Sequence, residues 1–146
     1  MHRDIKPANM AVVTRSPPNV IIIDFAVATW ENTSTDHMVG TIQYLAPEIM
    51  ALKQMTTTAS YSSRVDIYAL AVFAYQLFCN VPVLPRGVNL KGYGTMLKQL
   101  RQREWDADLA GIGILIEQMA EWDAQIRNSA AAALANPCFS NMIADD

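Results

Sequence analysis

The chain has 146 residues, which is enough for one domain with a sizeable core but too few for two. Apolar residues make up 51% of it and charged residues 17%, a balance typical of a folded globular protein rather than a disordered one. The net charge of −3 argues against binding nucleic acid through a broad basic surface. Cys79 and Cys138 match no zinc or disulfide spacing, so we expect an intracellular setting, cytoplasmic or nuclear.

The most apolar window of the chain runs from Ile67 to Cys79. It is too short to cross a bilayer, which needs about 20 apolar residues, and it contains Gln76. The charged N-terminus does not resemble a secretory signal either. We therefore expect no membrane insertion and interpret this window as a helix at the centre of the core.

Two short runs rich in β-branched residues lie near the N-terminus, Met10–Thr14 and Val20–Ile23. The residues between them include Pro17 and Pro18, which favour a turn, so the pattern predicts a small β-hairpin. The polar stretch that follows, residues 28–39, predicts an exposed loop.

After this loop the sequence becomes helical in character. We expect helices near the following ranges: Pro47–Lys53, Ser63–Cys79, Gly94–Arg103, Leu109–Glu121 and Ser129–Ala135. Ser62 or Ser63 can cap the second helix, and Asp66 adds a negative charge to its first turn. Pro82 and Pro85 then prevent the helix from continuing. The predicted fold is mainly α with a small β-hairpin.

The segment His2-Arg3-Asp4-Ile5-Lys6-Pro7-Ala8-Asn9 concentrates polar chemistry in one short loop. Phosphoryl transfer needs a base near the attacking hydroxyl, a positive charge near the transferred group and an oxygen ligand for magnesium. Asp4, Lys6 and Asn9 supply one of each. A chance occurrence is a poor alternative. The five residues His2, Arg3, Asp4, Lys6 and Asn9 would arise together at this spacing in only about 4 × 10⁻⁵ of chains of this length.

Two further motifs follow in order. Asp24-Phe25-Ala26 comes directly after an apolar run, at a strand end from which a carboxylate can reach a bound metal. Gly40-Thr41-Ile42-Gln43-Tyr44-Leu45-Ala46-Pro47-Glu48 comes next. In order and spacing, the three motifs resemble the catalytic loop, the magnesium loop and the end of the activation segment of serine/threonine protein kinases.

The resemblance implies a role for each motif residue, with ATP and Mg²⁺ as cofactors and a protein carrying Ser or Thr as partner. Asp4 orients and deprotonates the substrate hydroxyl, and Lys6 binds ATP and stabilises the transferring phosphoryl group. Asn9 and Asp24 hold magnesium. Thr41 belongs to the substrate-docking loop, and its presence together with Lys6 is the version specific for Ser and Thr.

The chain departs from the family pattern at Ala26, where glycine is usual. Alanine removes the freedom to adopt positive φ, so we expect a stiffer magnesium loop.

The resemblance also implies structural roles for the remaining matched residues: His2, Arg3, Phe25, Glu48, Asp66 and Arg127. Asp66 resembles the aspartate that opens the central helix and tethers the catalytic loop through its backbone. Arg127 resembles a buried arginine that pairs with the glutamate of the Ala-Pro-Glu signature, here Glu48.

Arg3 has two interpretations that the sequence leaves open. It is either a loop cation facing water, or the arginine that grips a phosphate or an acid in the activation segment. Candidate phosphorylation sites are Thr33, Ser34 and Thr35, and Asp36 is an alternative source of negative charge that needs no modification.

The resemblance implies that residues 1–140 form part of a kinase domain, a C-lobe that lacks the N-lobe and the helix before the catalytic loop, with 141–146 as a short tail. We therefore expect a fragment of a longer kinase, inactive on its own, with one flank of the central helix exposed. The alternative is a non-catalytic, kinase-derived interaction module. The oligomeric state is left open.

Overall fold

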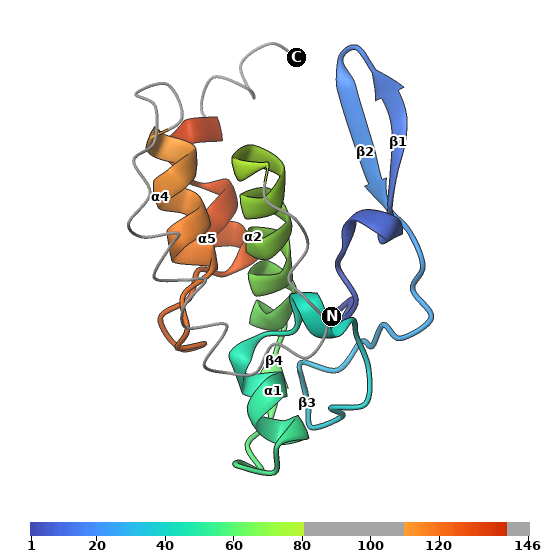
Figure 1. Ribbon diagram of the computed structural model, residues 1–146, viewed down its shortest axis with the longest axis vertical. Coiled ribbons are helices and arrows are strands. Elements are labelled where there is room, and N and C mark those ends of the chain that lie inside the picture. Colours follow the sequence, from blue (N-terminus) through green and yellow to red (C-terminus); the bar gives the residue numbers. More distant parts are fainter. Residues whose placement is uncertain (81–109, 140–146) are drawn as a thin grey trace.

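The structure is a computed structural model, and it describes residues 1–80 and 110–139. In chain order its elements are the short 3-10 helix η1 (Pro7–Asn9), β1 (Met10–Arg15), β2 (Pro18–Ile22), β3 (Thr33–Ser34), η2 (Ile42–Tyr44), α1 (Pro47–Lys53), β4 (Tyr61–Ser62), α2 (Arg64–Cys79), α4 (Ala110–Met119), α5 (Ala130–Leu134) and η4 (Pro137–Phe139). The described residues are thus mainly helical with a small β-hairpin, as predicted, and they contain a second two-stranded antiparallel sheet, β3–β4, that was not predicted (Figure 1).

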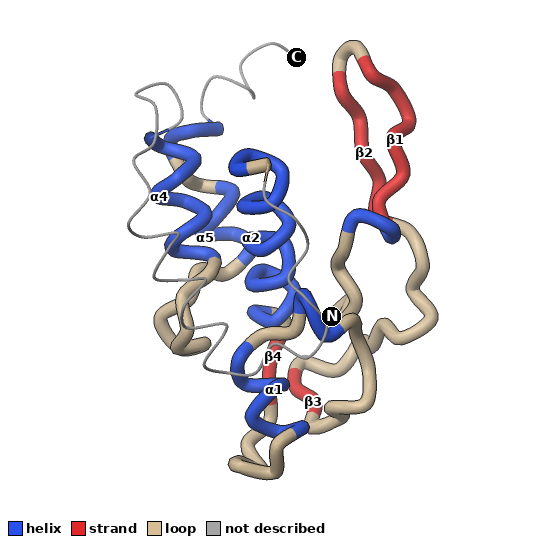
Figure 2. Tube along the Cα trace, viewed as in Figure 1, coloured by secondary structure: helices blue, strands red, loops and turns tan. Residues whose placement is uncertain are grey.

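The helical core is built around α2. Tyr68 and Val72 on this helix are almost completely buried. Figure 2 shows α4 beside α2, and Ile116 of α4 is only 2% exposed. The helices predicted for the regions now called α1, α2, α4 and α5 are confirmed within one or two residues at either end. The helix predicted over 94–103 lies outside the described residues.

The predicted hairpin is confirmed, with β1 and β2 antiparallel and Met10 opposite Ile22. β2 begins at Pro18, two residues earlier than expected. Most side chains of the hairpin are exposed, for example Val12 at 62% and Ile21 at 48%. In Figure 1 the hairpin stands away from α2 and α4, so it adds little to the core.

The predicted serine cap of α2 is wrong. Ser63 is the N-cap residue, but its side chain makes no capping bond because its backbone is already helical (φ −57°, ψ −11°) rather than extended. Ser62 lies in β4 instead. At the other end, Asn80 adopts a left-handed conformation (φ 48°) that ends the helix before the prolines, which lie outside the described residues.

The polar stretch 28–39 is not purely a loop. β3 within it pairs antiparallel with β4, placing Thr33 opposite Ser62 and Ser34 opposite Tyr61. Strands this short carry no alternation of apolar and polar residues, so the sequence pattern missed them. The pairing fastens this segment beside the start of α2.

Among the helices in residues 1–80 and 110–139, none combines the length and the hydropathy needed to cross a membrane.

Candidate active site

Asp4, Lys6 and Thr41 form a closed hydrogen-bonded triangle. Nζ of Lys6 donates to Oδ2 of Asp4 at 2.7 Å and to Oγ1 of Thr41 at 2.9 Å. The Thr41 hydroxyl donates in turn to Oδ1 of Asp4 at 2.7 Å. The side chains of Lys6 and Asp4 are 23% and 15% exposed, so solvent still reaches both. The carboxylate therefore accepts a hydrogen bond from a hydroxyl on one oxygen and from an ammonium group on the other.

Asn9 joins this triangle from the end of η1. Its Nδ2 donates to the backbone carbonyl of Asp4 at 2.9 Å and to Oδ2 of Asp4 at 3.1 Å. Both bonds use the amide nitrogen, and no donor within residues 1–80 and 110–139 binds the amide oxygen, which is thus suited to bind a cation. We call Asp4, Lys6, Asn9 and Thr41 the Asp4 cluster.

The surroundings of Asp4 favour its charged form. Burial alone would raise the pKa of the carboxyl, but hydrogen bonds from Lys6 and Thr41, the charge of Lys6 and the hydrogen bond from Asn9 together lower that pKa below its ordinary value. Asp4 is therefore a carboxylate at neutral pH.

Asp66 holds the loop that carries the cluster. The backbone N–H groups of His2 and Arg3 donate to its two carboxylate oxygens, both at 2.7 Å. Arg3 has a positive φ of 69°, which is unfavourable for a residue with a side chain. The two bonds offset this strain, so the first turn of α2 fixes the path of the loop that carries the Asp4 cluster.

Gly40 explains how Thr41 reaches the cluster. Its φ is +89°, and a Cβ there would lie 2.7 Å from the carbonyl oxygen of Arg3 and 2.7 Å from Cδ2 of Leu45. Only glycine permits this close approach of the two backbones. The next residue is Thr41, which is thereby placed against Asp4.

Asp24 lies next to the cluster without being bonded to it. The N–H of Ile23 donates to the backbone carbonyl of Asn9 at 2.9 Å, which brings the residue before Asp24 to the cluster's edge. The carboxylate of Asp24 accepts only a long bond (3.3 Å) from the N–H of Ala26, and none of the described hydrogen bonds joins it to the Asp4 cluster. Its oxygens are thus open to a cation. Ala26 does not have a positive φ, so alanine is unstrained in this conformation.

His2 links the loop that carries the Asp4 cluster to the segment Asp24-Phe25-Ala26. Its Nδ1 accepts from the N–H of Asp4 at 3.3 Å, so Nε2 carries the proton and lies 3.1 Å from the carbonyl oxygen of Ile23. The ring also meets Phe25 edge to face, with centroids 4.9 Å apart. His2 itself is buried, at 8% exposed, whereas Phe25 is 63% exposed, so Phe25 covers the His2 ring from the protein surface.

The guanidinium of Arg3 does not face water. Its side chain is 11% exposed, Nε donates to the carbonyl of Val27 at 2.6 Å, and Nη1 lies 3.4 Å from Oδ2 of Asp36. The interpretation of Arg3 as a solvated loop cation is therefore wrong. The arginine meets an acid of the following segment.

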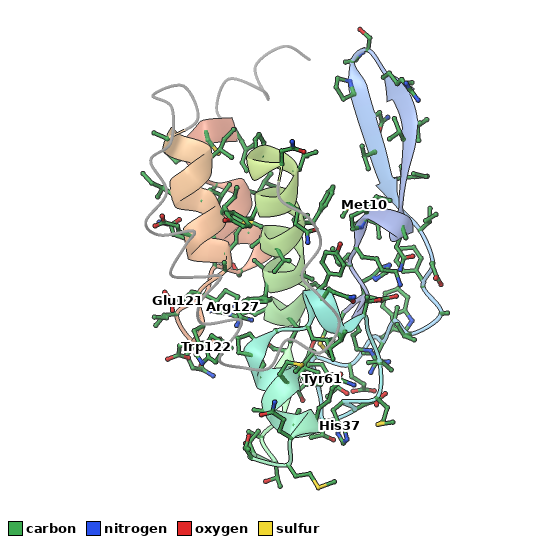
Figure 3. The ribbon with its side chains drawn as sticks, viewed as in Figure 1. Met10, His37, Tyr61, Glu121, Trp122 and Arg127 are labelled. Carbon is green, nitrogen blue, oxygen red and sulfur yellow. The ribbon has the colours of Figure 1, made fainter. Side chains whose placement is uncertain are left out.

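Glu48 of α1 and Arg127 form a second, separate arrangement, and Figure 3 shows Arg127 close to Glu121 and Trp122 in the loop after α4. Arg127 is completely buried, and its Nη1 and Nη2 donate to the two oxygens of Glu48 at 2.7 and 2.9 Å. Its guanidinium also lies 5.0 Å from the ring centroid of Tyr68. It donates further to the backbone carbonyls of Glu121, Arg64 and Trp122 at 2.7, 3.0 and 3.2 Å. The pair joins α1 to the loop after α4.

Two residues that take part in this framework were missed by sequence reasoning. Tyr61 donates its hydroxyl proton to the carbonyl of Asp36 at 2.6 Å. Arg64 donates to the carbonyls of Ala124 and Gln125 at 3.0 and 2.9 Å. Both act on backbone oxygens, which every residue type provides, so no sequence signal pointed to them.

Comparison with known proteins identifies the family of the chain. The family model described as the protein kinase domain matches residues 1–139. The chain belongs to the protein kinase family. It is 34% identical over 89 residues to serine/threonine-protein kinase PknF of Mycobacterium tuberculosis, covering 56% of the chain and 17% of that protein.

Two other relatives match nearly the whole chain. One is the probable serine/threonine-protein kinase fhkC of Dictyostelium discoideum, 31% identical over 147 aligned positions that cover 96% of the chain and 24% of that protein. The other is the liver/testis gamma catalytic chain of human phosphorylase b kinase, 25% identical over 142, covering 95% and 35%. The chain thus spans about a third or less of the length of these kinases.

Proposed function

We propose that the Asp4 cluster and Asp24 belong to the transfer site of a serine/threonine protein kinase, and that the chain is the C-lobe of its kinase domain. The observation that carries this proposal is the carboxylate of Asp4, which accepts a hydrogen bond of 2.7 Å from the Thr41 hydroxyl beside the ammonium group of Lys6. Membership of the kinase family and the serine/threonine kinases among the relatives support it.

In the proposed reaction, the hydroxyl oxygen of a substrate Ser or Thr forms a bond to the γ-phosphorus of ATP. The bond to the bridging oxygen breaks, its electron pair stays on ADP, and the hydroxyl proton passes to Asp4. A carboxylate with a lowered pKa is a weak base, so its first task is to orient the hydroxyl. In this reaction Lys6 would move from Asp4 to the phosphoryl oxygens and neutralise part of their charge. Asp4 then becomes more basic, because it loses the ammonium group that lowers its pKa.

Asn9 and Asp24 are suited to hold the magnesium ion of the nucleotide. Magnesium prefers oxygen ligands and takes one or two carboxylates together with substrate phosphates. The free amide oxygen of Asn9 and the exposed carboxylate of Asp24 match that donor set. When bound, the ion neutralises phosphate charge that would otherwise oppose transfer.

Thr41 gives the proposal its substrate class. Its hydroxyl donates to the carboxylate that a substrate hydroxyl must also reach, so Thr41 lies beside the position that the acceptor side chain would take. We infer that a serine or threonine side chain, short enough to approach Asp4 beside Thr41, is the acceptor.

A thermal shift with magnesium and ATP tests this proposal. At ten times the dissociation constant, bound nucleotide stabilises the fold by about 1.4 kcal/mol, or roughly 3–6 °C in melting temperature. Asp24→Asn should remove the shift because it removes a carboxylate from the ion. The matched control is Asp123→Asn, which changes the same charge on an exposed loop remote from the cluster and should keep the shift.

A second candidate is a non-catalytic interaction module. One flank of α2 is exposed, as expected, with Leu77 at 65% and Phe78 at 40%. Phe25 and Trp30 are also exposed and line a hollow of about 400 Å³. Apolar surface of this kind suits a protein partner. Folded, soluble protein that shows no shift with magnesium-ATP would favour this candidate over the first.

A further inference from the structure

Tyr61 makes a contact that none of the motifs contains. Its ring is 3% exposed at the start of β4, and its hydroxyl donates to the backbone carbonyl of Asp36 at 2.6 Å. Figure 3 shows Tyr61 beside the segment that carries His37. A nearly buried tyrosine is thus aimed at one residue of the segment that leads to Thr41.

Asp36 is held from a second side through its carboxylate. Oδ2 lies 3.4 Å from Nη1 of Arg3, and Oδ1 accepts the N–H of Met38 at 3.0 Å. Its own N–H donates to Oγ of Ser34 at 3.1 Å. One residue therefore joins the catalytic loop, through Arg3, to β4, through Tyr61.

The two residues that hold Asp36, Tyr61 and Arg3, are both connected to the start of α2. Tyr61 lies three positions before Arg64, the first residue of that helix, and the backbone of Arg3 is bound by Asp66 in its first turn. The segment 33–40 is thus attached at Asp36 to the region where α2 begins. Four residues later, Gly40 packs closely against the backbone of Arg3. Movement of Asp36 would be passed to Gly40 and Thr41.

We propose that Tyr61 is a positioning residue of the transfer site: through the carbonyl of Asp36 it holds the segment that places Thr41 against Asp4. The term transfer site rests on the proposed function. The bond from Tyr61 to Asp36 and its effect on the segment do not depend on catalysis. The negative charge that Arg3 meets in this arrangement is a carboxylate already present in the chain, so the attachment needs no phosphate.

Hydrogen exchange of the 146-residue protein, measured without nucleotide, tests the proposal. Mass spectrometry first establishes that Thr33, Ser34 and Thr35 carry no phosphate. Tyr61→Phe keeps the ring and removes only the hydroxyl, so the amide protons of Asp36 and Met38 should exchange about 2- to 12-fold faster, the loss expected for one hydrogen bond. Exchange in α2 and in the β1–β2 hairpin should not change.

Asp36→Asn provides a second variant, because it keeps the carbonyl that Tyr61 binds and removes only the charge that Arg3 meets. At about 1 M salt, where the screening length is about 3 Å, exchange of the segment should rise in the wild type and in Tyr61→Phe but not further in Asp36→Asn. The double variant should show less than the sum of the two effects, since both act on one residue.

Tyr44→Phe is the matched control, because it removes a hydroxyl bond of 3.0 Å to Gln76 from another buried tyrosine, outside the segment. It should leave exchange at residues 33–38 unchanged. Unchanged exchange of Asp36 and Met38 in Tyr61→Phe would overturn the proposal. So would a rise spread evenly over the whole protein, which would give Tyr61 a general packing role instead.

Discussion

Replacing Arg127 with alanine should sharply lower the stability of the protein. The substitution leaves the carboxylate of Glu48 without the two bonds of 2.7 and 2.9 Å that now neutralise it. Removing one partner of a buried ion pair costs about 3–5 kcal/mol. Glu48 is 20% exposed, so water compensates a little, but three backbone carbonyls also lose a donor. These two effects oppose each other, so the expected loss stays at about 3–5 kcal/mol.

For a chain of this size, that loss corresponds to a fall in melting temperature of roughly 6–20 °C, measured by circular dichroism and checked by urea unfolding. Arg127→Lys should recover only part of it, because an ammonium cannot make the two parallel bonds. Arg127→Met combined with Glu48→Gln should be less destabilising than Arg127→Ala, since no buried charge is left alone. Arg15→Ala, at an exposed arginine, is the control and should change stability by about 0.5 kcal/mol or less. A melting temperature of Arg127→Ala within about 2 °C of the wild type would refute the reasoning.

Three further predictions concern the loops around Asp4. Gly40→Ala should destabilise the protein by about 1–3 kcal/mol, because a Cβ at φ +89° meets the carbonyl of Arg3 at 2.7 Å; unaltered urea unfolding would contradict this. Asp66→Ala should cost about 2–4 kcal/mol, because the N–H groups of His2 and Arg3 lose their acceptors, and protease sensitivity of residues 1–9 should rise with it. The lowered pKa of Asp4 predicts that its contribution to stability is complete above its ordinary value of 3.8 and is lost as the pH falls through the lowered value. Unfolding curves between about pH 2 and 7 should show this acid-side loss in the wild type and not in Asp4→Asn, and equal pH slopes would count against it.

Local sequence patterns predicted most of the regular structure. The helix α1 begins at Pro47, as expected, because proline is favoured in the first turn and lacks the N–H that would be left unbonded there. The hairpin followed from its β-branched runs and turn residues. The cap of α2 was not predictable in this way, because the conformation of Ser63 depends on how β4 delivers the chain to the helix.

The sequence likewise predicted only part of the candidate site. The motifs placed Asp4, Lys6 and Asn9 in one loop, and the structure brings Thr41 to them from 35 residues beyond Lys6. The bond from Tyr61 to Asp36 could not be predicted, because its acceptor is a backbone carbonyl. Long-range contacts of this kind depend on tertiary packing rather than on residue type.

The central claim is that Asn9 and Asp24 bind the metal–nucleotide complex beside Asp4. It is tested most directly by nuclear magnetic resonance with Mn²⁺ in place of Mg²⁺, because this ion broadens signals from nuclei close to it. With ATP present, the account predicts broadening of the amide signals of Asn9, Ile23 and Asp24, and its loss in Asp24→Asn. Broadening centred elsewhere, or none at saturating ATP in folded protein, would contradict the account.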